Sequence, residues 1–396
     1  SSNGLEKRPK LRFPGFDEPY KQCHIGDIYA ERSQRGASDM VLLSVTMNDG
    51  VIPRSEIEGK DNSSADKSNY KVVLMGDMVY NSMRMWQGAN GISPYDGIVS
   101  PAYTVLMPKI PISNGYFAAL FKSPNLINEF RKNSQGMTSD TWNLKYPQIE
   151  TIKVHIPPLS EQNRVADMLG TLERRIAKQA QLVENLKKYK RGVVRTLLTP
   201  YSCCIADATW TTAKIGDLGS FTKGAPLSKA DIAPDGTPFI LYGELYTTYH
   251  EVINAVIRRT QAQPEKQYYS RVGDVVIPTS GETPEEISTA ACVMLPDIIL
   301  AGDLNIFRSS KIDGRIMSYI LNHIVNGQIA RIAQGKSVVH IQASELSKIE
   351  ISYPDYNTQR KMFKIFDALN TRTEIAQKKL MALRCMQKAL LQQLFM

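Results

Sequence analysis

The second half of the chain repeats the first half. At a shift of 197 positions, the stretch from Ile156 to Leu198 aligns without a gap on the stretch from Tyr353 to Phe395, which places Pro157 opposite Pro354 and Gln162 opposite Gln359. Shorter matches occur upstream at shifts between 190 and 199: Gly76-Asp77-Met78-Val79 with Gly273-Asp274-Val275-Val276, Ile25-Gly26-Asp27 with Ile215-Gly216-Asp217, and Gln135-Gly136 with Gln334-Gly335. Because the shift varies, loops of unequal length separate the shared elements. The repeat predicts a globular domain over 1–155, a long helix over 156–199, a second globular domain over 200–352 and a second long helix over 353–396.

Each predicted long helix carries a stripe of residues spaced alternately four and three apart, the pattern of a coiled-coil seam. The apolar members are Val165, Leu169, Leu172, Ile176, Val183, Leu186, Val193 and Leu197 in the first helix, and Met362, Phe366, Leu369, Ala376, Leu380, Leu383, Leu390 and Leu394 in the second. An isolated helix gains little from such a seam, so we expect the two helices to form an antiparallel intramolecular coiled coil. The alternative is that each helix packs only on its own globular domain. Four polar seam residues favour that alternative: Gln179, Lys190, Thr373 and Gln387.

Between the helices the pattern changes to short apolar runs separated by turn residues. The runs at 70–75, 97–99, 103–106, 272–277 and 298–300 read as strands, whereas 117–131 and 317–332 read as amphipathic helices. Each globular domain is therefore expected to combine a small irregular sheet with a helix or two. The fold class is α+β, with two similar domains joined by two long helices.

Composition narrows the class of protein without choosing a function. Of the 396 residues, 42% are hydrophobic and 22% are charged, which is typical of a globular protein and not of a disordered one. The net charge of +9 fits a polyanionic partner without requiring one. Five cysteines without a CxxC spacing support neither a disulfide framework nor a zinc site, and no apolar run reaches the ~18 residues of a membrane span. We expect a cytoplasmic protein without a metal or a membrane partner.

The motifs of common catalytic sites are missing from the sequence. There is no GxxxxGK[ST] phosphate loop, no GxGxxG after a strand and no HExxH, and the five histidines are scattered singly. The acid-rich run from Gly281 to Glu286 could supply paired carboxylates, but no basic cluster lies at a fixed spacing from it, and we interpret it as a loop. Catalysis is therefore not expected in this chain.

Two similar domains on antiparallel helices would form an object with an approximate two-fold axis. Duplex DNA has local two-fold axes too, so two such domains suit two half-sites separated by a gap. A helix of roughly 40 residues is at most ~60 Å long, which corresponds to on the order of 18 base pairs. The helix length would then set the spacing between half-sites.

The sequence resembles the specificity (S) subunit of type I restriction–modification systems over nearly its whole length. The resemblance is carried by Ile156-Pro157-Pro158-Leu159-Ser160-Glu161-Gln162 and the helix that follows, by Gly76 to Gly88 and by Gly97 to Tyr103. The second copy, Tyr353-Pro354-Asp355-Tyr356-Asn357-Thr358-Gln359, departs from the family pattern because it keeps only one proline and the glutamine.

The resemblance implies a non-catalytic reader of double-stranded DNA. Its two target recognition domains would each recognise half of a bipartite, asymmetric sequence with an unread spacer. The long helices would dock two modification subunits, which bind S-adenosylmethionine and methylate adenine, and ATP-dependent restriction subunits would join the complex. This chain itself would bind no cofactor.

Base recognition needs polar side chains on loops, and we chose loops that recur in both copies. In the first domain the candidate DNA-binding residues are Asn81, Ser82, Arg84, Trp86, Gln87, Ser134, Gln135, Thr138, Ser139 and Trp142. In the second domain they are Thr279, Ser280, Glu282, Gln334, Lys336, Ser337 and His340. For each residue the alternative is a solvated loop position or, for Trp86 and Trp142, a core aromatic. Replacing Arg84 or Lys336 with Ala is expected to weaken DNA binding.

Two further interpretations stay open at this level. The basic run Lys187, Lys188, Lys190 and Arg191 reads as a solvated helix face, with contact to phosphate or to a modification subunit as the alternative. For the whole chain, the rival classes are a self-contained nuclease or methyltransferase with a degenerate site, and a coiled-coil scaffold that recruits proteins without touching DNA. Affinity for duplex DNA with a salt dependence separates the reader from the scaffold.

Overall fold

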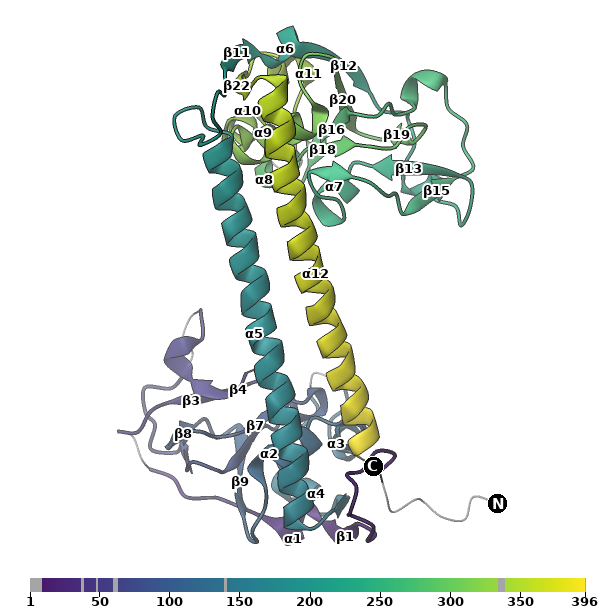
Figure 1. Cartoon of the computed structure of the whole chain (residues 1–396). Coiled ribbons are helices and arrows are strands. Elements are labelled where there is room, and N and C mark those ends of the chain that lie inside the picture. The colour runs from purple at the N-terminus through teal and green to yellow at the C-terminus, as the bar shows by residue number, and fades with distance from the viewer. Residues whose placement is uncertain are drawn as a thin grey trace. The chain divides into compact units, whose positions relative to one another are not determined.

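The computed structural model (Figure 1) describes residues 9–36, 39–47, 49–59, 63–138, 141–333 and 339–395. The chain divides into two compact units: unit 1 comprises Ser1–Gln181 and Gln377–Met396, and unit 2 comprises Leu182–Ala376. Each of the two long helices, α5 (Leu159–Leu197) and α12 (Tyr356–Leu394), therefore contributes one part to each unit. The predicted α+β class with two similar units and two long helices is confirmed.

Unit 1 contains short strands, short helices and the adjoining parts of α5 and α12. Its other elements are β1 (Lys21–His24), α1 (Ile25–Ile28), β2 (Tyr29–Glu31), β3 (Leu43–Thr46), β4 (Gly50–Pro53), η1 (Arg54–Glu56), β5 (Lys71–Val73), β6 (Met78–Asn81), η2 (Met85–Gln87), β7 (Asn90–Ile92), β8 (Gly97–Val99), β9 (Tyr103–Pro108), α2 (Asn114–Leu120), α3 (Pro124–Asn133), α4 (Tyr146–Ile149) and β10 (Lys153–Ile156).

The core of unit 1 lies on both faces of an antiparallel sheet with strand order β2-β9-β6-β7. Side chains alternate between the two faces along a strand, and β6 is buried on both. Met78 and Tyr80 pack in a cluster with α2, α3 and the start of α5, whereas Val79 packs with residues of β3, β4, β5, β8 and β9. The smaller pairs β3–β4 and β5–β8 thus cover the face that the helices leave open.

Unit 2 repeats this plan. Its elements besides the long helices are β11 (Trp210–Lys214), α6 (Ile215–Leu218), β12 (Gly219–Lys223), η3 (Lys229–Asp231), β13 (Thr237–Leu241), α7 (Glu244–Thr247), β14 (Val252–Ile253), β15 (Arg258–Thr260), η4 (Lys266–Tyr268), β16 (Asp274–Pro278), β17 (Ser280–Gly281), α8 (Pro284–Ile287), β18 (Ala291–Val293), β19 (Ile299–Ala301), β20 (Leu304–Ser309), α9 (Gly314–His323), α10 (Asn326–Ile332), β21 (Val339–His340), α11 (Ala343–Leu346) and β22 (Glu350–Pro354).

The central sheet of unit 2 has the order β12-β20-β16-β18-β14, and β16 is buried on both faces like β6. Val275 and Ile277 face a cluster with α9, α10 and the long helices, and Val276 faces a cluster with β13, β18 and β20. A second sheet, β15-β13-β19, lies beyond that cluster.

The sequence repeat corresponds to repeated backbone geometry. Gly76 and Gly273 have positive φ angles of 94° and 96°, and the aspartate that follows each one accepts a hydrogen bond from the backbone three residues earlier. Only glycine adopts this left-handed backbone without strain.

Gln162 and Gln359, which the alignment pairs, make the same two hydrogen bonds. The side-chain Nε2 of Gln162 donates to the carbonyl of Pro157 at 3.0 Å, and its Oε1 accepts from the backbone N of Ser113 at 3.1 Å. Gln359 bonds to Pro354 at 2.7 Å and to the N of Asp313 at 2.9 Å. Each glutamine therefore ties the start of a long helix to the cap of α2 or α9.

The second long helix begins normally although its first turn departs from the family pattern. At the position of the buried Glu161, the second copy has Thr358, which is also buried and donates its hydroxyl to Asp355 Oδ2 at 2.7 Å. Asp355 Oδ1 also accepts from the backbone N of Thr358, and these hydrogen bonds lower the pKa of Asp355 to about 2. An aspartate cap thus replaces the proline-proline start.

The long helices pack on each other in both units. In unit 1, Val165 and Leu169 at the start of α5 share a core with Leu394 and Phe395 at the end of α12. In unit 2, Val194 and Leu197 at the end of α5 share a core with Met362 and Phe366 at the start of α12. The helices are therefore antiparallel within each unit (Figure 1), and packing on the globular part alone is wrong.

Seam residues on the predicted list are buried or half-buried in the structure: Val165, Leu169, Leu172, Ile176, Val183, Leu186, Val193, Leu197, Phe366, Leu369, Leu380, Leu383, Leu390 and Leu394. Polar seam residues have partners. Gln387 Nε2 donates to Glu173 at 3.4 Å, the Thr373 hydroxyl donates to the Leu369 carbonyl at 2.8 Å, and Lys190 pairs with Glu251. Their polarity therefore does not exclude helix pairing.

Three local predictions are wrong. The helix expected over 117–131 is two helices, α2 and α3, because Pro124 occupies the first turn of α3 and the Ser123 side chain caps it. The helix expected over 317–332 breaks between α9 and α10, where the weak helix formers Ile324 and Val325 precede Asn326-Gly327.

The acidic run interpreted as a loop contains the short helix α8, because Thr283 caps the backbone N of Glu286.

Candidate nucleic-acid interface

The two candidate loops of unit 1 lie together. Trp86 and Trp142 meet edge to face with ring centroids 5.2 Å apart, and the backbone N of Leu144 donates to the carbonyl of Ser82 at 2.9 Å. Within the second loop, Gln135 and Asn143 exchange backbone hydrogen bonds of 2.9 and 2.8 Å. Residues 81–87 therefore form one surface with residues 134–138 and 141–144.

The side chains of these loops divide into an exposed set and an internal set. Arg84, Gln87, Gln135 and Thr138 are exposed, so they can reach a ligand. Ser82 is buried and bonds to Thr104, the Asn81 side chain accepts from the N of Met83, and the Ser134 hydroxyl donates to Phe130. The side chains of the internal set form hydrogen bonds within unit 1 and so hold the loops in place. Ser139 lies outside the described residues.

Trp86 and Trp142 are half-buried, so they are neither solvated nor fully in the core. Arg131, at the end of α3, places its guanidinium 5.5 Å from the centroid of the Trp142 ring. Arg131 was not among the predicted site residues. Its position in the last turn of a predicted helix, directly before the candidate loop, was the signal that could have found it.

The candidate residues of unit 2 also meet. Ser280 in β17 pairs with His340 in β21, and the backbone N of Ile341 donates to the carbonyl of Thr279 at 3.0 Å. Thr279 and Ser280 are buried, whereas Glu282 and His340 are exposed. The Ser280 hydroxyl donates to Asp303 Oδ2 at 2.8 Å. Gln334, Lys336 and Ser337 lie outside the described residues.

Asp303 belongs to a surface that the sequence did not indicate. Two adjoining hollows of about 420 and 880 Å³ lie beside the Thr279–Glu282 loop, and both are lined by Leu227, Ser228, Gly302 and Asp303. These residues come from the β12–η3 connection and the β19–β20 turn. Neither segment carries one of the motifs that recur in the two halves of the sequence.

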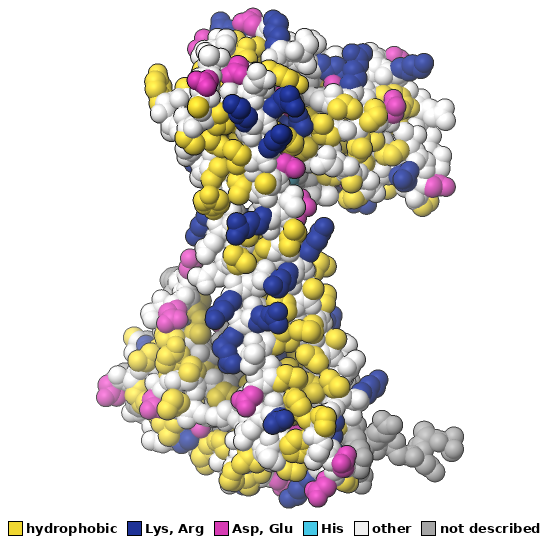
Figure 2. Space-filling model, viewed as in Figure 1, with side chains coloured by type: hydrophobic (Ala, Val, Ile, Leu, Met, Phe, Trp, Pro, Cys, Tyr) yellow, Lys and Arg dark blue, Asp and Glu magenta, His cyan; other side chains and the backbone are white. Residues whose placement is uncertain are grey.

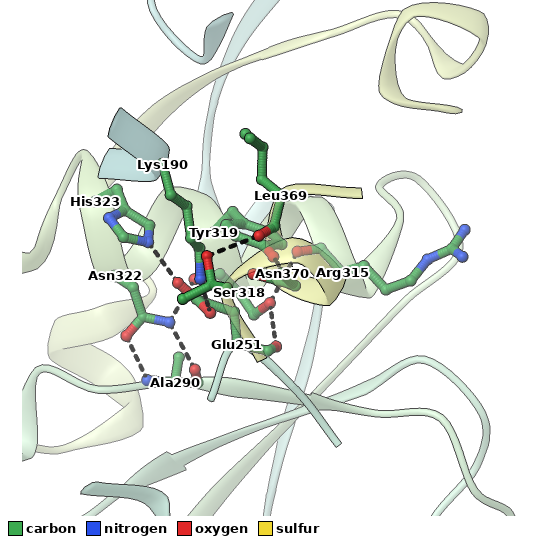
Figure 3. A network of polar contacts seen from close by, with 11 residues as sticks. Lys190, Glu251, Ala290, Arg315, Ser318, Tyr319, Asn322, His323, Leu369 and Asn370 are labelled. Atoms are coloured by element: carbon green, nitrogen blue, oxygen red, sulfur yellow. Dashed lines mark hydrogen bonds and ion pairs between the residues drawn. The ribbon is translucent and has the colours of Figure 1, made fainter. Parts of the chain in front are cut away.

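The basic run near the end of α5 is only partly a solvated face. Lys187, Lys188 and Arg191 are exposed, but Lys190 is half-buried and its Nζ lies 2.9 Å from Oε2 of Glu251. Figure 3 shows Lys190 and His323 pointing toward Glu251 from different sides. For Lys190, the expected solvated position is wrong, because its ammonium group forms an ion pair with the buried carboxylate of Glu251.

Glu251 is the centre of a buried polar network in unit 2. His323 Nε2 lies 2.7 Å from Glu251 Oε1, and the Ser318 hydroxyl donates to the Glu251 carbonyl at 2.7 Å. Tyr319 stacks on the His323 ring and accepts a hydrogen bond from Asn370 of α12 at 2.6 Å. The network thus connects α5, α9 and α12 within unit 2.

Burial alone would raise the pKa of Glu251. The hydrogen bond from His323 and the charge of Lys190 oppose that effect and lower the pKa of Glu251 to about 2. The carboxylate is therefore charged at neutral pH, and its partners compensate it.

Unit 1 has a different buried ion pair. Arg12 makes two hydrogen bonds of 2.8 Å to Glu161 in the first turn of α5, and Tyr20 donates to the same carboxylate at 3.2 Å. Burial and the nearby Glu161 charge raise the pKa of Tyr20. This pair fixes the segment around Arg12 and Tyr20 to the start of the helix.

The positive charge of the chain is concentrated in the long helices. Helices α5 and α12 together carry 17 Lys and Arg against 6 Asp and Glu, a net charge of +11. Because the whole chain carries +9, all other residues together carry −2. Figure 2 shows Lys and Arg side chains distributed along the long helices. The globular parts are therefore nearly neutral, and the excess positive charge of the chain lies on the long helices.

Among the residues that the structure describes, no three or more His, Cys, Asp and Glu side chains gather closely enough to hold a metal ion. No helix in the described part of the chain has the length and apolar character needed to cross a bilayer.

Comparison with known proteins gives consistent matches along the chain. A family model described as type I restriction modification DNA specificity domain matches residues 34–188 and again 208–384. The type I restriction enzyme MjaVIII specificity subunit of Methanocaldococcus jannaschii is 22% identical, with 93% of this chain and 89% of the relative covered. The putative MjaX specificity subunit of the same organism is 19% identical, with 91% and 92% covered.

Two solved structures share the fold. The S subunit of a type I restriction–modification system from M. genitalium has a TM-score of 0.60 at 13% identity, covering 98% of this chain and 99% of the other. A chain from a structure described as complex assembly and conformational transition of the type I R-M system has a TM-score of 0.61 at 15% identity, covering 96% and 98%.

Proposed function

The chain belongs to the family of type I restriction–modification DNA specificity subunits, and from this premise we propose that its two units each read one half of a bipartite, asymmetric DNA sequence. A specificity subunit is a recognition subunit and not the catalyst. The observation that carries the proposal is that the two units share backbone elements but expose different side chains on their candidate loops. Unit 1 exposes Arg84 and Gln135 beside a Trp pair, whereas unit 2 exposes Glu282 and His340 beside Asp303. Unlike loops on equivalent frames suit unlike half-sites.

The helices supply the second part of the proposal. We infer that α5 and α12 set the distance between the half-sites and dock two modification subunits. Those subunits would bind S-adenosylmethionine and methylate adenine, while this chain binds no cofactor. Restriction subunits with an ATP-dependent motor and a nuclease would join the complex. The net charge of +11 on the helices supports a role in holding polyanionic DNA or acidic partner surfaces.

The proposal is tested by enriching a randomised duplex pool with the chain, alone and bound to its modification subunit. The expected result is two short fixed sequence blocks with a constant gap. Binding that weakens steeply with salt but enriches no motif would contradict sequence reading. A bound partner with no DNA affinity at any salt concentration would instead favour the protein-recruiting scaffold.

The spacing role has its own test. Inserting seven residues into the middle of both helices preserves the heptad register and lengthens each by about 10 Å, or about three base pairs. The gap in the enriched motif should grow by about three base pairs while both fixed blocks stay the same. An unchanged gap would contradict the helices as the spacing element. Native mass measurement of the purified complex then gives the number of modification subunits.

A further inference from the structure

The two hollows of unit 2 form one continuous groove, which we call the Asp303 groove. One end is lined by Lys223, Thr279 and Leu304, and the other by Lys229, Tyr242, Glu244, Tyr246, Arg258 and Glu282. The four residues common to both ends, which include Gly302 and Asp303, lie between them. The predicted reading loop therefore borders both hollows, with Thr279 at the smaller one and Glu282 at the larger one.

The turn that carries Asp303 is held tightly. Gly302 has a positive φ of 75°, and a side chain there would come within 3.3 Å of the Leu227 carbonyl and 3.5 Å of the Tyr242 ring. The backbone N of Thr279 donates to the Asp303 carbonyl at 2.7 Å. Asp303 is thus positioned by the loop that contains the predicted DNA-binding residues Thr279, Ser280 and Glu282.

The Asp303 carboxylate has capacity for a further hydrogen bond. Its Oδ2 accepts from the Ser280 hydroxyl at 2.8 Å, which orients the group, and the residue is exposed. An ionised carboxylate offers about four acceptor positions, and Ser280 takes one. A donor in the groove can therefore bind Asp303 without displacing Ser280.

The other charged groups of the groove have distinct roles. Glu244 is buried and its Oε1 accepts from Arg258 Nε at 2.9 Å, so these two charges compensate each other. Burial and the charges of Glu286, Tyr242 and Glu282 raise the pKa of Tyr246, which also lines the groove. Lys223 and Lys229 add positive charge at the two ends. The groove thus has exposed carboxylates, Asp303 and Glu282, together with two exposed lysines.

The carboxylates and lysines of the groove favour a ligand that has an amino group close to phosphates. In the major groove of DNA, adenine N6 and cytosine N4 are donors, whereas guanine and thymine present acceptors at the corresponding positions. A carboxylate attracts the first pair and repels the second. Lys223 and Lys229 suit the phosphates on either side.

We propose that the Asp303 groove reads an amino-bearing base, adenine or cytosine, in the half-site of unit 2, with Asp303 as the residue that determines specificity and Glu282 as a second acceptor. The proposal rests on the proposed function of the chain, because it names the base chemistry for one of its two reading units.

The test is motif enrichment by the complete complex with its modification subunit, comparing wild type with Asp303→Asn. The amide keeps the shape but can both donate and accept. In wild type, one position of the unit 2 block should exclude guanine and thymine by about 5- to 150-fold, the range for a specific base contact. In Asp303→Asn that exclusion should fall below about 3-fold, while the unit 1 block stays unchanged.

Three control variants separate reading from structure and charge. Ser280→Ala removes the orienting hydrogen bond but keeps the carboxylate, so it should weaken the preference less than Asp303→Asn does. Asp235→Asn makes the same charge change at an exposed carboxylate that bonds to Gln261, outside the groove, and should leave the motif unchanged. Lys229→Gln should weaken binding to all sequences and reduce the salt slope by about 1.

The outcomes distinguish this proposal from the one it rests on. If wild type yields no bipartite motif, the proposed function fails. If wild type yields the motif and neither Asp303→Asn nor Glu282→Gln relaxes any position, the proposed function stands and the Asp303 groove is not the reading site. Relaxation by Ser280→Ala as large as that by Asp303→Asn would also overturn direct reading by the carboxylate.

Discussion

Units 1 and 2 share a backbone frame and differ in the side chains attached to it. The Gly-Asp turn and the paired Gln162 and Gln359 have the same hydrogen bonds in both units. The surfaces differ: Arg84 and the Trp86–Trp142 pair in unit 1 have no counterpart in the acid-lined Asp303 groove of unit 2. Positions that set backbone geometry have therefore remained alike, and positions that face outward have diverged.

The units differ equally in the buried charges that hold their helices. In unit 1, Glu161 at the start of α5 is paired with Arg12. In unit 2, the buried carboxylate belongs to Glu251, which lies outside the long helices and pairs with Lys190 of α5 and with His323. The two units therefore hold their long helices with different buried ion pairs. Each ion pair should stabilise the unit that contains it.

The largest expected effect comes from removing one of these carboxylates. Glu251→Ala leaves Lys190 and His323 partly buried without their anion, which should lower the free energy of unfolding of unit 2 by about 3–5 kcal/mol. Glu161→Ala should do the same to unit 1. Hydrogen exchange resolved by peptide measures each unit separately. Loss of protection spread equally over both units would contradict independent attachments.

The same contrast should appear in the pH dependence of stability. The pKa of Glu251 is lowered from 4.5 to about 2 in the folded chain, so its charged form stabilises the folded state. That contribution is fully present above about pH 4.5 and is lost as the pH falls toward 2. Thermal unfolding between pH 6 and pH 2.5 should show unit 2 of Glu251→Gln losing less stability than wild type. Parallel profiles for the two proteins would rule out this linkage.

A smaller and symmetrical effect is expected for the paired glutamines. Gln162→Leu and Gln359→Leu each leave a backbone N and a buried proline carbonyl without their partner, at a cost of about 1–3 kcal/mol. The two losses should be similar because the four hydrogen bonds are equivalent. Denaturant unfolding followed by the same peptide-resolved exchange checks this, and a large difference between the two variants would show that the frame is not equivalent.

The sequence predicts the frame better than the site because the frame repeats. The heptad stripes and the alignment of Gln162 with Gln359 are visible in the sequence, and so is the Gly-Asp turn. Pro124 is visible too, and it marks the start of α3 because proline is tolerated in the first turn of a helix and not in its interior. By contrast, Lys190 and Glu251 are 61 positions apart and Ser280 and Asp303 are 23 apart, with no motif linking either pair. Such contacts depend on tertiary structure, which one sequence does not specify locally.

The smallest expected effect is at an exposed ion pair. It shows that burial, and not the distance between the charged atoms, decides how much an ion pair contributes to stability. Lys187 and Lys190 are both on α5, and each Nζ lies 2.9 Å from a glutamate oxygen, Glu184 for the first and Glu251 for the second. The Lys187 and Glu184 side chains are 45% and 61% exposed, against 16% and 10% for Lys190 and Glu251. Water screens the first pair, so Lys187→Gln should change the free energy of unfolding by about 0.5 kcal/mol or less. Lys190→Gln should cost several times more, and equal losses in the two variants, measured by denaturant unfolding at matched salt, would contradict the assignment of Lys190 to the buried network.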